Sequence, residues 1–177
     1  MLESERVFIR LIEREDLVFR TEWINDEEVA QTLMFDWPLS LAGTHKWFEQ
    51  QLLDNTRKNF VIIDKSSDTP IGITGLRDIN YRHLRAQFYM TIGNKDFWGK
   101  RIPDEVIPIV LEYAFEELAL NRVYLYTLDN NERARRVYER NGFIQEGILH
   151  NHFFCRGAYR DLWVMAFLKR QWLGRKR

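Results

Sequence analysis

The chain has 177 residues and a mass of 21.5 kDa, which fits a single domain spanning 1–177. A hydrophobic content of 45%, with only 9 glycines and 4 prolines, excludes a disordered or collagen-like chain. Basic and acidic residues balance at 26 each, so we expect no DNA partner, because DNA-binding affinity depends on excess positive charge. Cys155 is the only cysteine, which excludes an internal disulfide and a thiolate zinc site.

The amino-terminal segment 1–10 is charged and lacks the apolar stretch of a secretory signal. The sequence also lacks a run of about 18 apolar residues, so it predicts no membrane-spanning helix and no membrane partner. We therefore expect a cytoplasmic protein whose chemistry comes from a bound cofactor or from side-chain acids and bases.

The first half of the chain predicts strands separated by short helices. Alternating apolar residues predict a strand over Val7–Leu11, followed by two or three short helices up to residue 53. Two apolar runs, Phe60–Asp64 and Ile71–Leu76, flank a Ser, Asp and Pro cluster, which is typical of an antiparallel hairpin. Strict alternation over Ala86–Ile92 predicts a third strand.

The second half predicts alternating strands and helices. A helical pattern opens at Pro103, a favourable first helical position. The apolar run Val123–Leu128 predicts a strand buried on both faces. A helix over Asn131–Arg140 follows, and Gly142 suits the left-handed position after a helix. The chain is predicted to be a mixed α/β domain.

The carboxyl-terminal part predicts a hairpin and a tail. Phe143–Phe154 and Tyr159–Leu168 have the pattern of two strands joined by a short turn. The last basic residues are predicted to form a frayed tail: Lys169, Arg170, Arg175, Lys176 and Arg177.

Two segments have the pattern of a functional site. In Met90–Val106 a strand, a turn and a helix follow one another, and N–H groups at a helix start can bind phosphate; the alternative is an ordinary connection. Asn131, Ala134 and Tyr138 are spaced to share one helix face. Tyr138 could donate a proton and Asn131 could bind an amide or cap the helix, but core packing explains the same spacing.

Together these segments resemble the GNAT acyl-CoA-dependent N-acetyltransferases. The resemblance rests on these residues: Gly99-Lys100, Asn130-Asn131, Ala134, Tyr138 and Asn141-Gly142-Phe143. Other segments resemble the branch that contains ribosomal-protein N-terminal, spermidine and amino-sugar acetyltransferases: Phe8-Ile9-Arg10-Leu11, Arg14-Glu15-Asp16, Trp23-Ile24-Asn25-Asp26 and Gly157-Ala158-Tyr159-Arg160-Asp161. The resemblance implies an α/β (α+β) fold with a mixed, mainly antiparallel central sheet of about six to seven strands and helices on both faces.

The resemblance also implies roles for particular residues. Main-chain groups of Thr91, Ile92 and Gly93 would pair with the pantetheine arm of acetyl-CoA. Asn131 would bind the pantetheine, and Tyr138 would protonate the departing thiolate as the catalytic acid. The pyrophosphate would be held by the loop Trp98, Gly99, Lys100, Arg101, Ile102 and Pro103. The acetyl group would pass from the cosubstrate acetyl-CoA to a primary amine by direct attack in a ternary complex, without a metal.

The loop departs from the family pattern at Arg101 and Pro103, where the family has Gly or Ala. Arg101 is bulky but offers a charge-assisted bond to phosphate, and Pro103 lacks an N–H donor. We expect acetyl-CoA binding to be retained. The alternative function is a non-catalytic regulatory module that binds acyl-CoA or an amine.

The acceptor is left open between a polyamine, a protein amino terminus and an amino sugar. Seven acidic residues lie from Glu13 to Glu28, and a solvated helix face explains most of them. In the family that the chain resembles, this region borders the acceptor site, so a surplus of carboxylates there would favour a cationic amine. Trp23, Trp37 and Trp47 could stack on a sugar ring or pack in the core.

The general base and the assembly state are also left open. His150 and His152 lie two apart on a predicted strand and would share a face, where either could accept a proton. Metal binding by the pair lacks further ligands, so no metal is expected. The predicted edge strands permit a homo-oligomer.

Overall fold

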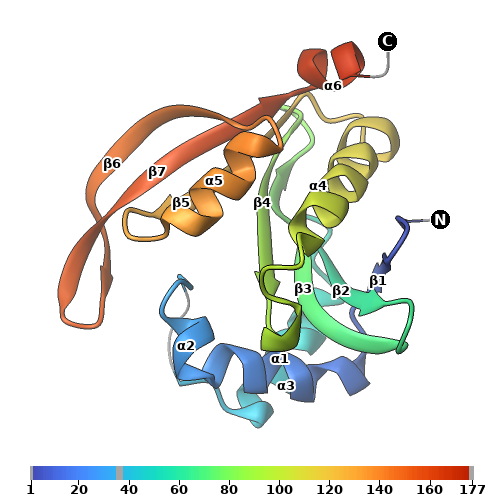
Figure 1. Cartoon of the computed structure of the whole chain (residues 1–177), viewed down its shortest axis with the longest axis vertical. Coiled ribbons are helices and arrows are strands. Elements are labelled where there is room, and N and C mark those ends of the chain that lie inside the picture. Colours follow the sequence, from blue (N-terminus) through green and yellow to red (C-terminus); the bar gives the residue numbers. More distant parts are fainter. Residues whose placement is uncertain (1, 35–37, 176–177) are drawn as a thin grey trace.

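One seven-stranded sheet, in the order β1-β2-β3-β4-β5-β7-β6, forms the centre of the molecule (Figure 1). The computed structural model describes residues 2–34 and 38–175. The strands are β1 (Val7–Leu11), β2 (Lys58–Asp64), β3 (Thr69–Asn80), β4 (Arg85–Ile92), β5 (Arg122–Leu128), β6 (Ile144–Cys155) and β7 (Ala158–Leu168). Neighbouring strands are antiparallel except β4 and β5, which are parallel. The mainly antiparallel sheet predicted from the resemblance is confirmed.

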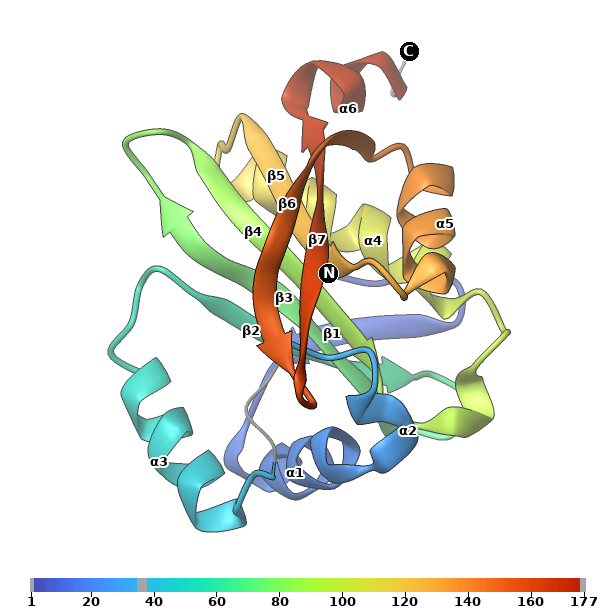
Figure 2. The same ribbon diagram turned by 90° about the vertical axis from the view of Figure 1, so that its left-hand side faces the viewer.

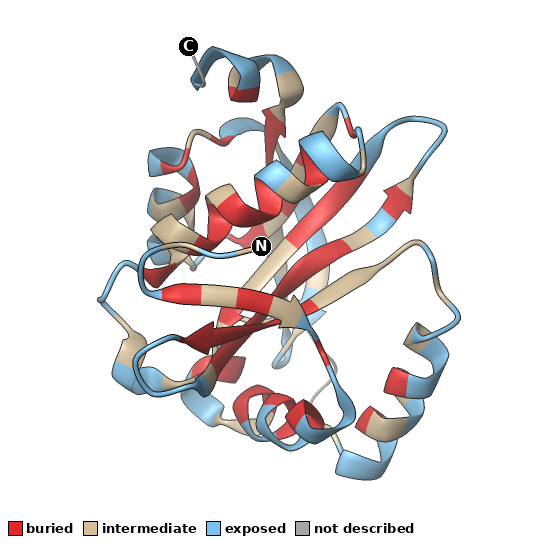
Figure 3. Ribbon diagram, turned by 90° about the vertical axis from the view of Figure 1, so that its right-hand side faces the viewer, coloured by how far each residue is buried: buried red, intermediate tan, exposed pale blue. Residues whose placement is uncertain are grey.

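Helices cover both faces of this sheet. They are α1 (Leu17–Asn25), α2 (Glu27–Ala30), α3 (Leu41–Gln51), α4 (Ile102–Glu112), α5 (Glu132–Arg140) and α6 (Lys169–Arg175). Short 3₁₀ turns occur at Arg14–Asp16 and Lys95–Phe97, and a π-helical stretch, Tyr113–Glu117, extends α4. Successive residues of β4 point to opposite faces, so Phe88 packs in the core under α4 while Tyr89 packs against α1 and α3. Figure 3 shows buried residues gathered where α4 meets the strands.

Polar caps set the limits of the short helices near the amino terminus. The Asp26 carboxylate accepts hydrogen bonds of 3.0 Å from the N–H groups of Glu28 and Val29, which starts α2. The Ser40 hydroxyl accepts from the N–H of Gly43 at 3.0 Å, which starts α3. Among the described residues no helix is long and apolar enough to cross a membrane.

The two parallel strands in the middle of the sheet pair over only a short length. Register pairs join β4 and β5 from Arg85–Gln87 to Arg122–Tyr124, and no pair between these strands follows Gln87 in the described chain. Each strand nevertheless keeps its other neighbour, since Ile92 pairs with Gly72 and Leu128 pairs with Leu162. The sheet therefore opens between β4 and β5, and one edge of each strand is left without a partner strand.

The prediction that β5 is buried on both faces is wrong. Val123, Leu125 and Thr127 are buried, whereas Tyr124 and Tyr126 on the opposite face are half-buried. Tyr126 lines the cavity between the two strands. The sequence pattern alone could not distinguish a strand covered on both faces from one that borders a cavity. Tyrosine rings occur in both settings, because they have an apolar body and a polar tip.

The prediction of a frayed tail is wrong for residues 169–175, which form α6. Trp172 is buried, and its indole N–H donates to Glu116 Oε1 at 2.7 Å. Arg175 donates to the carbonyl oxygen of Asn141 at 2.8 Å and lies over the ring of Phe167. These anchors fix the helix despite its basic composition; Lys176 and Arg177 lie outside the described residues.

The last two strands form a long hairpin that curves away from the rest of the sheet (Figures 1 and 2). β6 is mostly exposed along its length. Four large apolar side chains on this hairpin are exposed: Ile144, Ile148, Phe154 and Tyr159. Gly142, before the hairpin, has φ of 86°, the left-handed conformation that the sequence predicted after α5.

Candidate functional site

A cavity of about 370 Å³ occupies the opening between β4 and β5. Its wall combines both faces of β4, the end of β5, one side of α5, the start of α4 and the segment around α2. The cavity therefore connects the face of the sheet that α4 covers with the face near α2. A passage of this kind allows two molecules to approach one reaction centre from opposite sides of the sheet.

Most of the residues that the sequence singled out meet at this cavity. The predicted site residues that line it are Thr91, Ile92, Trp98, Gly99, Pro103, Asn131 and Tyr138. Gly93, Lys100, Arg101 and Ile102 do not line it. Ile102 is instead buried in the core under α4, and the Lys100 ammonium lies 4.9 Å from the centre of the Phe97 ring.

Some main-chain groups at the end of β4 already have partners within the protein. The N–H of Gly93 donates to the carbonyl oxygen of Ile71 at 3.0 Å. The indole N–H of Trp98 donates to the carbonyl oxygen of Ile92 at 2.8 Å. A ligand that pairs with this edge would therefore use the remaining main-chain groups of β4. The Trp98 bond also fixes the loop after β4 against the strand.

The start of α4 presents unpaired donors. Gly99 and Arg101 have φ of 79° and 58°, so the chain turns through two left-handed residues before the helix. Within the described chain, the N–H groups of Gly99, Arg101 and Ile102 donate to no protein acceptor. Pro103 has no N–H to contribute. These N–H groups and the helix dipole make the start of α4 favourable for an anion.

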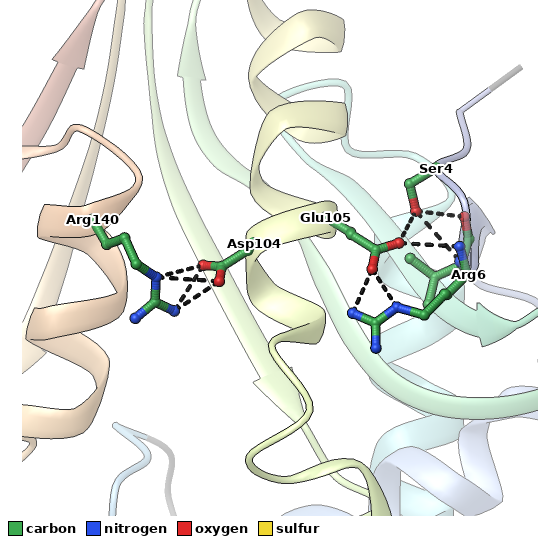
Figure 4. Close-up of polar contacts among 6 residues, drawn as sticks. Ser4, Arg6, Asp104, Glu105 and Arg140 are labelled. Atoms are coloured by element: carbon green, nitrogen blue, oxygen red, sulfur yellow. Dashed lines mark hydrogen bonds and ion pairs between the residues drawn. The ribbon is translucent and has the colours of Figure 1, made fainter.

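Two carboxylates in the first turn of α4 are held by arginines from different elements (Figure 4). Asp104 accepts from Arg140 at 2.8–3.1 Å and from the Asn141 amide at 2.7 Å. Glu105 accepts from the Ser4 hydroxyl at 2.6 Å and from Arg6. Burial acts to raise the pKa of both carboxyl groups, but these hydrogen bonds outweigh it, and each pKa lies below its usual value. The arginines thereby neutralise acids that would repel an anion at the helix start.

We expect Asp104→Ala to lower the free energy of unfolding by about 1–2 kcal/mol, because Arg140 and Asn141 lose their partner in a partly exposed site. The pKa of Asp104 is lowered in the folded state, so its contribution is complete above the unfolded value of 3.8 and disappears as the pH falls through the lower folded pKa. Urea unfolding of both proteins from pH 7 to pH 3 measures this difference. An equal difference at both ends would contradict the assignment, and Arg136→Ala, which breaks an exposed pair, is the control.

Tyr138 is buried and lines the cavity. Its ring packs edge-on against Phe88, with centroids 6.2 Å apart, and against Phe143 at 5.8 Å. Burial raises the pKa of Tyr138 to about 12, because the tyrosinate anion would be poorly solvated there. The phenol therefore keeps its proton across the neutral range, as a proton donor requires.

Asn131 and Thr127 form the wall opposite β4. The Asn131 side-chain oxygen accepts from the N–H of Ala134 at 3.1 Å, so it caps α5 and leaves its amide N–H₂ available to a ligand. Thr127 was missed by the sequence analysis. Its hydroxyl is buried at the cavity and has no hydrogen-bond partner among the described residues, although unsatisfied buried polar atoms are costly. A hydroxyl residue in an otherwise apolar strand was the available signal.

The four arginines of α5 have different environments. Arg133 lines the cavity, and its guanidinium lies 5.2 Å from the centre of the Trp98 ring. Arg135 lies over Trp163, Arg136 pairs with Glu132, and Arg140 binds Asp104. Arg133 is the member of this group that faces the cavity.

The acidic segment near the amino terminus contributes little charge to the cavity. Asp16 is buried against Arg10, and Asp26 caps α2 while pairing with Lys95. Glu28 is the carboxylate among the described lining residues, and its oxygen lies 3.3 Å from Lys95 Nζ. A solvated or structural role therefore accounts for most of these acids.

The tryptophans proposed for sugar stacking have other partners. Trp23 is buried against Gly93 and stacks on Phe19. The Arg20 guanidinium lies 4.0 Å from the centre of the half-buried Trp47 ring. Neither tryptophan lines the cavity, and Trp37 lies outside the described residues.

His150 and His152 lie in an irregular part of β6, where Asn151 between them has φ of 49°, so their common face stays a prediction. Leu149 pairs with Leu162 on β7, and Phe153 pairs with Arg160. Over this stretch β6 therefore has more residues than β7, which makes a bulge in β6. His150 Nδ1 lies 2.8 Å from an oxygen of Asp161 and is strongly exposed. Among the described residues no group of three or more His, Cys, Asp or Glu could hold a metal ion.

Known proteins are similar to this chain in sequence and fold. Residues 6–144 match the Acetyltransferase (GNAT) domain family. The chain is 31% identical over 173 residues to a spermidine N(1)-acetyltransferase from Vibrio cholerae, covering 97% of this chain and 98% of that protein. It is 32% identical over 181 residues to the putative ribosomal N-acetyltransferase YdaF from Bacillus subtilis, covering 98% and 97%.

A solved structure shows the same likeness. The crystal structure of spermidine N-acetyltransferase from Vibrio cholerae in complex with CoA and spermine matches with a TM-score of 0.90 at 29% identity, covering 96% of this chain and 99% of that chain.

A cavity between two separated strands, with free N–H groups at the adjoining helix start, fits a transferase that binds a phosphate-bearing cosubstrate. The chain belongs to the GNAT acetyltransferase family. It is an N-acetyltransferase that uses acetyl-CoA as cosubstrate.

Proposed function

We propose that this enzyme holds acetyl-CoA in the opening between β4 and β5 and transfers the acetyl group directly to a primary amine, with Tyr138 as the catalytic acid. The observation that carries the proposal is the position of Tyr138, buried at the cavity with its pKa raised to about 12. The geometry of β4, α4 and α5 around that residue supplies the cosubstrate site.

The start of α4 would bind the pyrophosphate. N–H groups of Gly99, Arg101 and Ile102 are available there, and the Arg133 guanidinium adds positive charge beside Trp98. Remaining main-chain groups of Thr91, Ile92 and Gly93 would pair with the pantetheine arm, opposite the Asn131 amide and the Thr127 hydroxyl. Lys100, in the same loop before α4, adds to the positive charge there.

The residues around the reacting centre have separate tasks. A main-chain N–H of β4 polarises the thioester carbonyl while the neutral amine attacks its carbon. As the carbon–sulfur bond breaks, Tyr138 donates its proton to the departing sulfur. The new amide nitrogen loses its extra proton to water in the cavity, and the Tyr138 anion regains a proton because its pKa is about 12. CoA and the N-acetyl product leave, and no covalent enzyme intermediate forms.

The experiment that tests this function is acetyl-CoA-dependent release of free thiol by purified protein, with a panel of amines and with acetyl-CoA binding measured in parallel. Release that depends on an amine supports the proposal. Acetyl-CoA binding without release on any amine would favour the alternative, a regulatory module that binds acyl-CoA. Absence of both would contradict the proposed cosubstrate site.

Arg101→Gly tests whether the loop before α4 has kept its ability to bind the phosphates of acetyl-CoA or has lost it. Arg101 holds φ of 58°, so glycine should stabilise the folded protein by about 0.5–1 kcal/mol after its higher unfolded entropy is subtracted. We expect the same variant to bind acetyl-CoA about 3- to 10-fold more weakly, because a charge-assisted contact to phosphate is lost. Thermal unfolding and calorimetry measure the two effects, and tighter binding would show that Arg101 obstructs the site.

We propose that the protein works as a homo-oligomer. A spermidine N-acetyltransferase from Vibrio cholerae has been solved as a dodecamer and matches 98% of this chain at 30% identity. The exposed apolar side chains of the β6–β7 hairpin provide a surface for such contacts. Light scattering on the sample used for activity gives its mass against the 21.5 kDa of one chain.

A further inference from the structure

Arg77 lines the cavity near the point where β4 and β5 separate. It is the register partner of Gln87, and Gln87 is the last β4 residue that pairs with β5. The next residue, Phe88, contacts the ring of Tyr138. Both Arg77 and Gln87 line the cavity. Arg77 therefore lies one β4 position away from the residue that contacts Tyr138, the proposed catalytic acid.

Arg77 faces the side of the sheet opposite Tyr138. Residues directly across neighbouring strands share a face, so Arg77 points to the side of Gln87 and not to the side of Phe88. Gln87 pairs with Tyr124 on β5, so these two side chains share a face. Side chains two residues apart on a strand also share a face, which adds Tyr89 on β4 and Tyr126 on β5. We call the lining residues Arg77, Gln87, Tyr89 and Tyr126 the acceptor wall.

Among the described residues, Arg77 has a neutral side chain and not a carboxylate as its hydrogen-bond partner. With its amide oriented to accept, Gln87 takes hydrogen bonds from Arg77 Nη2 at 2.7 Å and from Nε at 3.2 Å. An amide is neutral, and no carboxylate of the described chain forms an ion pair with Arg77. Gln87 orients the guanidinium and leaves three of its five N–H donors for another partner.

Other charged groups near the acceptor wall have partners or oppose Arg77. Burial raises the pKa of the nearby Tyr124 phenol, and Asp78 raises this pKa further while Arg77 lowers it. Arg57 pairs with Asp54, and Glu28, the carboxylate of the described lining, lies beside Lys95. Arg77 is the cationic side chain of the acceptor wall, and it would repel a second ammonium group on the acceptor.

We propose that the acceptor is a primary amine that also carries an oxyanion, a carboxylate or a phosphate, and that Arg77 binds this group. The inference rests on the proposed function, since it concerns the acceptor side of the same cavity. A guanidinium held by its Nε and one Nη side presents its free edge to an oxyanion in a fixed orientation. The bound oxyanion would place the amine of the same molecule near the thioester.

Matched pairs of amines test the proposal. The pair 4-aminobutanoate and 1,4-diaminobutane compares a carboxylate with an ammonium on similar chains, and phosphoethanolamine with ethanolamine tests a phosphate; spermidine is included as a polyamine. We expect the oxyanion-bearing member of at least one pair to have a kcat/KM about 10- to 100-fold higher, as expected for charge-assisted hydrogen bonds. The pair that shows the difference distinguishes a carboxylate from a phosphate. Better use of the members without an oxyanion, spermidine included, would overturn the proposal.

Arg77→Gln should reduce this preference at least about tenfold and leave the KM for acetyl-CoA unchanged. Arg85→Gln is the matched control, because Arg85 is an exposed arginine on β4 outside the cavity. An unchanged preference in Arg77→Gln, or an equal loss in Arg85→Gln, would contradict the role of Arg77.

A binding measurement separates this inference from the proposed function. Thermal-shift titration of the CoA-saturated protein with the same amine pairs needs no turnover. Tighter binding of the oxyanion-bearing amines, lost in Arg77→Gln, supports the inference even where no thiol is released, in which case the proposed function alone fails. Equal binding of both members of each pair overturns the inference whatever the activity.

Discussion

Tyr138→Phe should lower kcat by about 10²- to 10⁴-fold, with the KM for acetyl-CoA changed less than about twofold. In the proposed mechanism the hydroxyl donates a proton to the departing sulfur, whereas the ring alone packs against Phe88 and Phe143. Phenylalanine preserves that packing, and among the described residues no hydrogen bond to the Tyr138 hydroxyl is formed. We therefore expect the free energy of unfolding to change by less than about 0.5 kcal/mol.

The pH profile adds a second check on Tyr138. Because burial raises its pKa to about 12, the protonated acid form persists throughout the usual assay range, and this residue should cause no loss of kcat up to about pH 10. Tyr113→Phe, at a partly buried tyrosine outside the cavity, is the control. Steady-state kinetics on the three proteins decides the matter, and a kcat of Tyr138→Phe within a few-fold of the original enzyme would refute the assignment.

Gly93→Ala should lower the free energy of unfolding by about 2–3 kcal/mol, in the range found for overpacked sites. A Cβ at this position would lie 2.1 Å from ring atoms of Trp23, which is far inside van der Waals contact. The Trp23 ring is buried under α1, so it has little space to move. The same clash would displace the end of β4 from α1, and we expect weaker acetyl-CoA binding as well.

Two variants make the Gly93 prediction specific. Gly147→Ala adds the same methyl group where no atom lies within 4 Å, so its effect on unfolding should stay within about 0.5 kcal/mol. Trp23→Leu combined with Gly93→Ala should recover part of the loss, because the smaller side chain makes room for the methyl group. Chemical denaturation measures each variant. Equal losses for the two glycine variants would show that the close approach of Trp23 has no energetic consequence.

Local patterns in the chain were sufficient for most of the secondary structure. The alternation in β4, the Ser40 and Asn131 caps and the left-handed Gly142 depend on residues close in sequence, and the structure contains them all. The residues around Tyr138 also lie within two short segments, so they identified the cosubstrate side. The family match confirms the predicted GNAT family, and the roles of these residues stay predictions.

Contacts between segments far apart in the sequence could not be predicted from local sequence patterns. Trp172 anchors α6 through Glu116, Tyr126 lines a cavity where its strand was expected to be covered, and β6 is irregular around the two histidines. Each depends on which surface a neighbouring element presents, and that information is spread over the whole chain.

The sequence by itself determined the family and the element order, and it predicted the acetyl-CoA side of the site, because periodicity, caps and short motifs are local properties. The proposed acceptor side could be inferred only from the tertiary structure. Arg77 and Tyr138 are far apart in sequence, and the short pairing of β4 with β5 brings them to the same cavity from opposite faces. The electrostatic character of that cavity is a sum over side chains from several elements, so it exists only once the sheet has formed.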